Sequence, residues 1–230
     1  MPNVFFAHRR NLRKHLAIFL FIAAALLSIA SHGINWDRLR LSMRALGGDE
    51  QIFNEWSNLI VSQADTTIEA KLQKVNNFFN RKLAYVEDIE GWGQSDYWAT
   101  PLESMAKRKA DCEDFVIAKY FSLRNLNIPD TQLRLIYVKA KFGGANSTIT
   151  QAHMVLAFYP AADAEPLILD NLISDIRPAS RRTDLSPIFS FNGQGVFAGA
   201  ASNATLGPGG TSRLSRWQDL LERAKKEGFE

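Results

Sequence analysis

Residues 111–123 read DCEDFVIAKYFSL and predict a helix that is buried on nearly every side. Asp111 suits the N-cap position, because its carboxylate can accept a hydrogen bond from a free N–H group of the first turn. The side chains that follow are apolar nearly all round, which is typical of a helix enclosed by its own domain. The helix should end near Asn127, before Pro129. Cys112, the only cysteine of the chain, therefore stands in the first turn of a core helix.

The segments around this helix predict the rest of the fold. Upstream, residues 35–95 are expected to be largely helical, and residues 51–63 and 66–83 have apolar side chains at helical spacing. Thr100 and Glu103 form a capping box that begins a short helix. Downstream, three strand-like runs with short or turn-rich linkers favour antiparallel pairing: residues 133–142, 152–159 and 167–170. Residues 192–211 indicate a loop, and residues 212–226 an amphipathic helix. Helices and an antiparallel sheet indicate an α+β fold.

Residues 1–30 have the three parts of an export signal. A basic stretch, residues 8–15, precedes an apolar run from Leu16 to Leu27, and the small-residue site Ser28-Ile29-Ala30 follows. The run is short for a transmembrane span, although an uncleaved anchor stays open. We expect residues 1–30 to be a signal peptide, residues 31–230 to be a single domain, and the protein to act in the periplasm.

The charge of the chain does not point to nucleic acid. The net charge is +3 and the pI about 9.0, but residues 1–30 hold four Arg and Lys residues and no acid. The rest of the chain holds 23 basic and 24 acidic side chains. The basic pI therefore belongs to the N-terminal segment, and we expect no nucleic-acid partner.

Three residues could form a catalytic set. A helix N-terminus stabilises a thiolate at Cys112, although a lone cysteine is ordinarily inert and buried. His153 is the only histidine beyond His32, and it begins the run of residues 152–159. Its imidazole could exchange a proton with the thiol. Asp170 ends the next run and could orient His153 if the two strands pair, although turns also favour aspartate.

Three carboxylates surround the proposed nucleophile. Asp111, Glu113 and Asp114 are within two residues of Cys112, and like charges raise the pKa of a thiol. The helix dipole offsets only part of this repulsion. A bound hard cation such as Ca²⁺ would remove the conflict, since it prefers carboxylate oxygens. Helix capping is the alternative; it explains Asp111 well and all three acids less well.

Five segments, in this order, closely resemble the LapG family of periplasmic transglutaminase-like cysteine proteases of bacteria. They are residues 96–103 (DYWATPLE), 111–115 (DCEDF), 118–120 (AKY), 152–156 (AHMVL) and 169–171 (LDN). The resemblance runs from about residue 75 to residue 197. Relatives commonly have glycine where this chain has Ala110. Alanine can replace that glycine only if the backbone at this position avoids positive φ.

The resemblance implies a papain-like, transglutaminase-like core with a triad of Cys112, His153 and Asp170. It also implies dependence on Ca²⁺, with Asp111 and Glu113 as ligands and Asp114 contributing. The implied substrate is a large surface adhesin, cut near its N-terminus at a di-alanine site so that cells leave the biofilm. The implied partner is an inner-membrane receptor that senses cyclic di-GMP and holds the protease inactive.

Two other functions remain open from the residues alone. Transamidation would use the same three side chains, with an amine in place of water as the acyl acceptor. A non-catalytic binding module would use the fold only to dock partners, although such a module has no need of all three residues. The leading hypothesis is a calcium-dependent cysteine endopeptidase.

Overall fold

The computed structural model describes residues 34–143, 147–200 and 214–229. Residues 34–230 form one compact unit. The expected signal segment, residues 1–30, lies outside the described residues. Within the described ranges, no helix is long and apolar enough to cross a membrane.

Helices make up most of the first half of this unit. Several begin at a side chain that accepts a hydrogen bond from the first turn: Asp49, Thr67, and Thr100 in its capping box with Glu103. Such caps satisfy N–H groups that have no partner inside the helix, so short sequence patterns set these starts. The helices are α2 (Trp36–Ala45), α3 (Glu50–Gln63), α4 (Ile68–Lys82), α5 (Asp88–Gly91), α6 (Pro101–Lys107), α7 (Cys112–Asn125) and α8 (Ser215–Glu227), with short 3₁₀ turns η1 (Asp130–Gln132) and η2 (Ala179–Arg181).

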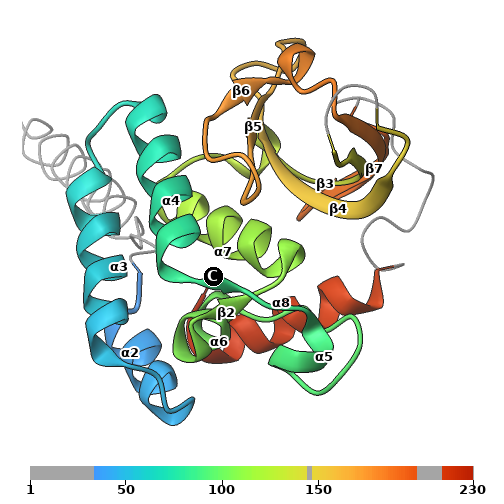
Figure 1. The fold of residues 1–230 in the computed structure, drawn as a ribbon. Helices are drawn as coiled ribbons and strands as arrows, with labels where there is room; N and C mark the ends of the chain where they lie inside the picture. The colour runs from blue at the N-terminus through green and yellow to red at the C-terminus, as the bar shows by residue number, and fades with distance from the viewer. Residues whose placement is uncertain (1–33, 144–146, 201–213, 230) are drawn as a thin grey trace, which may run out of the picture. The chain divides into compact units, whose positions relative to one another are not determined.

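Helix α7 lies in the middle of the unit (Figure 1), and every residue from Asp114 to Leu123 is buried. Helix α3 is joined to it by a hydrogen bond of 2.9 Å from Trp56 Nε1 to Ser122 Oγ. Trp217 of α8 packs edge-on against Tyr120, with 5.6 Å between ring centroids. Neighbours therefore enclose α7 on several sides, as its apolar sequence predicts.

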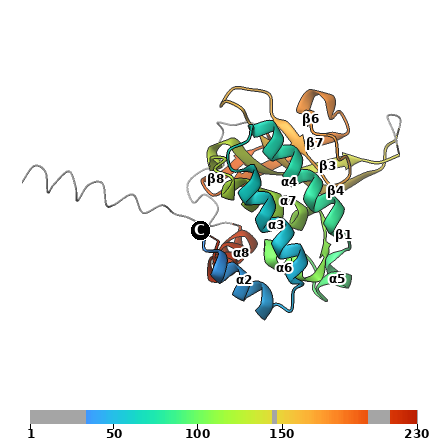
Figure 2. The same ribbon diagram turned by 90° about the vertical axis from the view of Figure 1, so that its left-hand side faces the viewer.

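The second half of the unit is an antiparallel sheet of six strands in the order β6-β5-β4-β3-β7-β8. The strands are β3 (Leu133–Lys141), β4 (Thr150–Phe158), β5 (Leu167–Leu169), β6 (Arg177–Pro178), β7 (Leu185–Asn192) and β8 (Gly195–Ala198). The sheet is strongly curved in Figure 1, and Figure 2 shows α2 and α6 at the end of the unit away from it. The expected α+β fold, with a cysteine-bearing helix packed on an antiparallel sheet, is confirmed.

A two-stranded parallel pair links the upstream segments to the start of α7. β1 (Ala84–Tyr85) pairs with β2 (Lys109–Ala110), directly before Asp111. The pairing brings the segment that follows β1, which includes α5, to the N-terminus of α7. Ala110 is not among the residues with positive φ, so the alanine carries no backbone strain here.

Two local expectations were wrong. Residues 84–85, within the region expected to be largely helical, form β1, and residues 195–198, expected as a loop, form β8. β8 pairs with β7 and buries Phe197, whose ring the Arg134 guanidinium covers at 3.7 Å. Tertiary pairing and packing thus override the glycine-rich local composition.

Candidate active site

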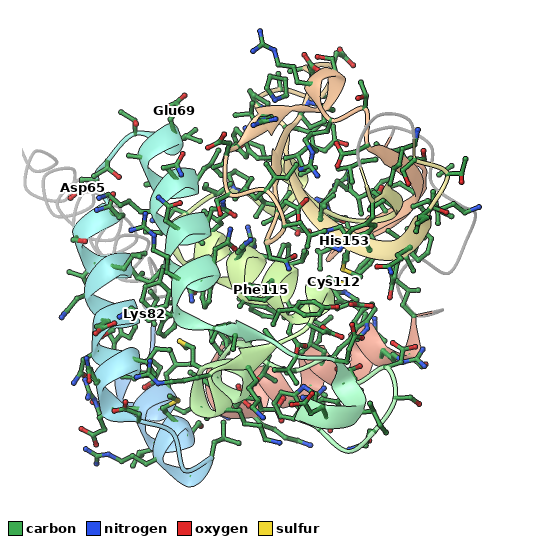
Figure 3. The ribbon with its side chains drawn as sticks, viewed as in Figure 1. Asp65, Glu69, Lys82, Cys112, Phe115 and His153 are labelled. Atoms are coloured by element: carbon green, nitrogen blue, oxygen red, sulfur yellow. The ribbon has the colours of Figure 1, made fainter. Side chains whose placement is uncertain are left out.

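Cys112 is the first residue of α7 and lies where that helix meets β4. Its N-cap, Asp111, accepts a hydrogen bond from the Asp114 N–H (3.1 Å). Figure 3 shows Cys112 and His153 at this end of α7, and the N–H of Met154 donates to the thiol sulfur. The partly buried thiol is thus placed beside the peptide that joins His153 to Met154.

His153 and Asp170 lie in contact. β4 and β5 are antiparallel neighbours, with Leu156 opposite Leu169, and Asp170 directly follows β5. His153 Nε2 lies 2.8 Å from Asp170 Oδ1, and the two side chains are 4% and 0% exposed. Because Nε2 is engaged, Nδ1 is the ring nitrogen that remains for a proton exchange with the thiol.

The Asp170 carboxylate has further partners that hold it as an anion. Its Oδ1 accepts from the Leu172 N–H (3.0 Å), and its Oδ2 accepts from Arg182 Nη2 (2.7 Å). Burial alone would raise the pKa of Asp170, but the contacts with His153 and Arg182 outweigh it and hold the pKa at about 2. A carboxylate of this kind can fix the orientation of an imidazole and stabilise its charged form.

The thiol lies against a carboxylate. Cys112 Sγ donates to Glu113 Oε2 at 2.6 Å, and the Tyr137 hydroxyl donates to Glu113 Oε1 at 3.4 Å. Burial raises the pKa of Cys112 well above its usual range, and the charges of Glu113 and Asp111 add to this effect. The Met154 N–H opposes it only in part. In this arrangement the sulfur stays protonated, as the acidic surroundings predict.

Three other carboxylates come together beside the start of α7. Ligand oxygens of Asp88, Asp111 and Asp114 all lie within 4.8 Å of one another, and all three residues are buried. Asp88 Oδ2 accepts from the Tyr97 N–H (2.5 Å), and Asp114 Oδ1 from the Ala99 N–H (2.7 Å). Burial raises the pKa of each acid. Repulsion from the other cluster acids adds to this rise at Asp111 and Asp114, whereas at Asp88 the added repulsion comes from Glu113 and Asp96.

This cluster fits a hard cation. Its donors are carboxylate oxygens, and Asp88 Oδ1 is a buried acceptor without a hydrogen-bond donor among the described residues. Of the three ligands expected from the sequence, Asp111 and Asp114 belong to the cluster. The Glu113 carboxylate is outside it and faces the thiol.

The sequence did not point to Asp88 or Arg182. Asp88 precedes Asp111 by 23 positions, in an acidic segment that resembles an ordinary solvated turn, and no spacing pattern joins the two. Arg182 is one of many basic residues, and its burial beside Asp170 depends on how the chain returns after β6. The roles of both residues become visible only from their neighbours in the folded structure.

The first candidate donor for an oxyanion hole is the backbone N–H of Cys112. The Cys112 N–H is at the first helical position, where a backbone N–H has no partner within the helix. The segment Tyr97–Trp98 was the expected place for a second donor, but the Tyr97 N–H is engaged by Asp88. The Ala99 N–H, two residues further along the chain, is engaged by Asp114.

Comparisons with known proteins show what the chain is similar to. The family model described as bacterial transglutaminase-like cysteine proteinase matches residues 54–185. Solved structures of Legionella pneumophila LapG are similar: one has 38% identity and a TM-score of 0.69, covering 83% of this chain and 98% of that one. An EGTA-treated form of the same protein has 38% sequence identity and a TM-score of 0.71, with the same coverage of both chains. A calcium-bound form has 37% sequence identity and a TM-score of 0.66, and the match covers 83% of this chain and 99% of that one. No curated protein sequence matches the chain.

Proposed function

The chain belongs to the LapG family of bacterial transglutaminase-like cysteine proteinases, and we propose that it is a calcium-dependent endopeptidase with Cys112 as nucleophile. One observation carries this proposal. The only thiol of the chain is at the N-terminus of α7, beside the peptide that follows a buried histidine bonded to a carboxylate.

The proposed reaction uses these groups in sequence. Cys112 Sγ attacks the scissile carbonyl as a thiolate, after its proton passes to Nδ1 of His153. The Cys112 N–H donates to the oxyanion, and His153 returns the proton to the leaving amine. Water then hydrolyses the acyl-enzyme, with His153 as general base. Asp170 holds the imidazole and balances its charge in both steps.

Calcium is the proposed cofactor. Asp88, Asp111 and Asp114 would hold it. The resemblance also implies Glu113 as a ligand, and its carboxylate would then have to leave the thiol that it contacts here. Bound there, a divalent cation would neutralise the carboxylates whose charge keeps the Cys112 thiol protonated. The buried cluster supports this assignment, and a LapG of Legionella pneumophila has been solved in a calcium-bound form.

The proposed substrate and partner follow from membership of the family. We infer cleavage of a large surface adhesin near its N-terminus, at a di-alanine site, and release of cells from the biofilm. Control would come from an inner-membrane receptor that senses cyclic di-GMP. The signal-like residues 1–30 support a periplasmic location.

The test is incubation of the purified protein with an N-terminal adhesin fragment that contains a di-alanine site. Two shorter products are expected with calcium, and none from Cys112→Ala. Asp65→Asn is the matched control, because Figure 3 shows this exposed residue far from Cys112. Crosslinked species would instead indicate a transamidase. Intact substrate with every variant would indicate a binding module, and full cleavage by Cys112→Ala would refute the assigned nucleophile.

A further inference from the structure

Tyr137 of β3 brings a hydroxyl group close to the proposed nucleophile. It lies opposite Met154 in the antiparallel pairing of β3 with β4, and the Met154 N–H donates to the Cys112 sulfur. On the helical side, Glu113 Oε2 accepts from the thiol at 2.6 Å, while Glu113 Oε1 accepts from the Tyr137 hydroxyl at 3.4 Å. The thiol and the hydroxyl are therefore joined through the two oxygens of a single carboxylate.

The packing of the core explains the Tyr137 ring but not its hydroxyl. The ring lies against those of Phe189 and Trp98, with 4.7 and 6.3 Å between centroids. A phenylalanine would make the same ring contacts without a polar group to satisfy. Among the described residues, the hydroxyl has one hydrogen-bond partner, Glu113, and that bond is long. The polar end of Tyr137 is thus directed at the active site rather than at the core.

The Glu113 carboxylate occupies a place that a reacting carbonyl oxygen would take. In a tetrahedral intermediate the anionic oxygen lies beside the sulfur, because both are bonded to the same carbon. Here an anionic oxygen lies beside the sulfur, and the Tyr137 hydroxyl donates to the same carboxylate. A phenol is protonated at neutral pH and can donate. When Glu113 takes the role of calcium ligand that the resemblance implies, the hydroxyl loses this acceptor and can serve a substrate.

The side-chain N–H donors near the thiol are engaged or enclosed. The Trp92 indole N–H donates to Asp114 Oδ2 at 3.3 Å. The Trp98 indole N–H has no acceptor among the described residues, but it is buried in the core, where its ring stacks on that of Phe191 at 5.5 Å. A substrate carbonyl cannot reach it there. Tyr137, in contrast, is partly exposed.

We propose that the Tyr137 hydroxyl is the second donor of the oxyanion hole, together with the Cys112 N–H. The inference rests on the proposed function, in which Cys112 is the nucleophile. As the sulfur bonds to the carbonyl carbon, the π electron pair moves to the oxygen, and the two donors stabilise the resulting negative charge. Tyr137 keeps its own proton throughout. When the electron pair returns, the C–N bond breaks and the amine leaves with the proton from His153.

The test compares two reactions of Cys112 in the full chain. Acylation by p-nitrophenyl acetate, followed through the release of nitrophenolate, passes through an oxyanion. Alkylation by iodoacetamide uses the same thiolate and forms no oxyanion. The ratio of the two rates therefore reports on the oxyanion hole and not on the acidity of the thiol. In Tyr137→Phe this ratio should fall by about 10²–10³-fold.

Tyr159→Phe is the matched control. The Tyr159 hydroxyl donates to the Ala200 carbonyl, and the residue directly follows β4, at the opposite end of that strand from His153. Its loss should leave the ratio at the wild-type value. Tyr137→Phe keeps the ring that packs in the core, and circular dichroism checks that both variants are folded.

An unchanged ratio in folded Tyr137→Phe would overturn the proposal, and a fall in Trp98→Phe instead would assign the donor to the indole. A wild type that the ester acylates but that leaves the adhesin fragment intact would refute the proposed function and not this donor. A wild type acylated no faster than Cys112→Ala would refute both. Where the fragment is cleaved, Tyr137→Phe should lower kcat with KM nearly unchanged, since the contact forms only in the transition state.

Discussion

Arg182 Nη2 donates to Asp170 Oδ2 over 2.7 Å, so the carboxylate that holds His153 is itself held by a buried cation. The Arg182 side chain is 1% exposed, and Asp184 accepts two further hydrogen bonds from it. The orientation of His153 thus depends on a chain of contacts that extends beyond the three residues expected to react.

Replacing Arg182 should therefore damage the protein more than replacing a neighbouring surface arginine. Arg182→Met leaves the buried Asp170 charge uncompensated and should lower the free energy of unfolding by about 3–5 kcal/mol. Arg177→Met removes a surface pair with Asp175 and should cost about 1 kcal/mol or less. Urea unfolding of both variants checks this, and equal losses would contradict the role given to Arg182.

Asp170 should control stability in acid. Its pKa in the folded protein, about 2, is below the usual value near 3.8, so its contribution is complete above pH 4 and is lost as the pH falls toward 2. The stability advantage of the wild type over Asp170→Asn should shrink by about 2 kcal/mol between pH 5 and pH 2. Denaturant melts at several pH values measure it; a constant difference would show that Asp170 is not a stabilised anion.

Asp170→Asn should also reduce catalysis at neutral pH. The amide can no longer balance the charge of the imidazolium and favours a different ring tautomer, so kcat should fall by about 10²–10⁴-fold. Cleavage kinetics with the adhesin fragment give this number. Circular dichroism of the same sample confirms that the loss is not one of folding.

Removing calcium should lower both stability and activity. Asp88→Asn should weaken calcium binding by about tenfold or more, because it removes one charge from a three-carboxylate site. Isothermal titration calorimetry measures the affinity, with Asp65→Asn as the exposed control.

In the chelated protein, the raised pKa values of Asp88, Asp111 and Asp114 mean that stability falls as the pH rises above about 4, and calcium should abolish this fall. A Tm unaffected by chelator at pH 8 would count against the site.

Glu113→Gln should make the thiol more acidic in the calcium-free protein. The variant removes the charge that lies against Cys112 Sγ and, after burial, contributes most to the raised pKa of that thiol. Alkylation of Cys112 by iodoacetamide in the presence of chelator should then begin at lower pH than in the wild type. Glu90→Gln, on an exposed position of α5, is the control. Identical profiles for the two variants would mean that the Glu113 carboxylate does not act on the sulfur.

Much of the fold could be read from the sequence because its signals are local. The capping side chains of Thr100 and Asp111 act within one helical turn, and the apolar residues after Cys112 specify a buried helix wherever that helix is placed. The contact between His153 and Asp170 was also expected, since a short linker joins two runs with strand character. β7 and β8 were missed because their pairing depends on a sheet that must already exist.

The sequence by itself determined which groups can react: one thiol, one histidine in the body of the chain, and acids on both sides of the thiol. Only the tertiary structure decided which distant side chains join them, namely Asp88 in the carboxylate cluster and Arg182 on Asp170. Identity and short-range order are properties of the chain itself. The strength of a charge depends on burial and on neighbours from other segments, and these exist only after folding.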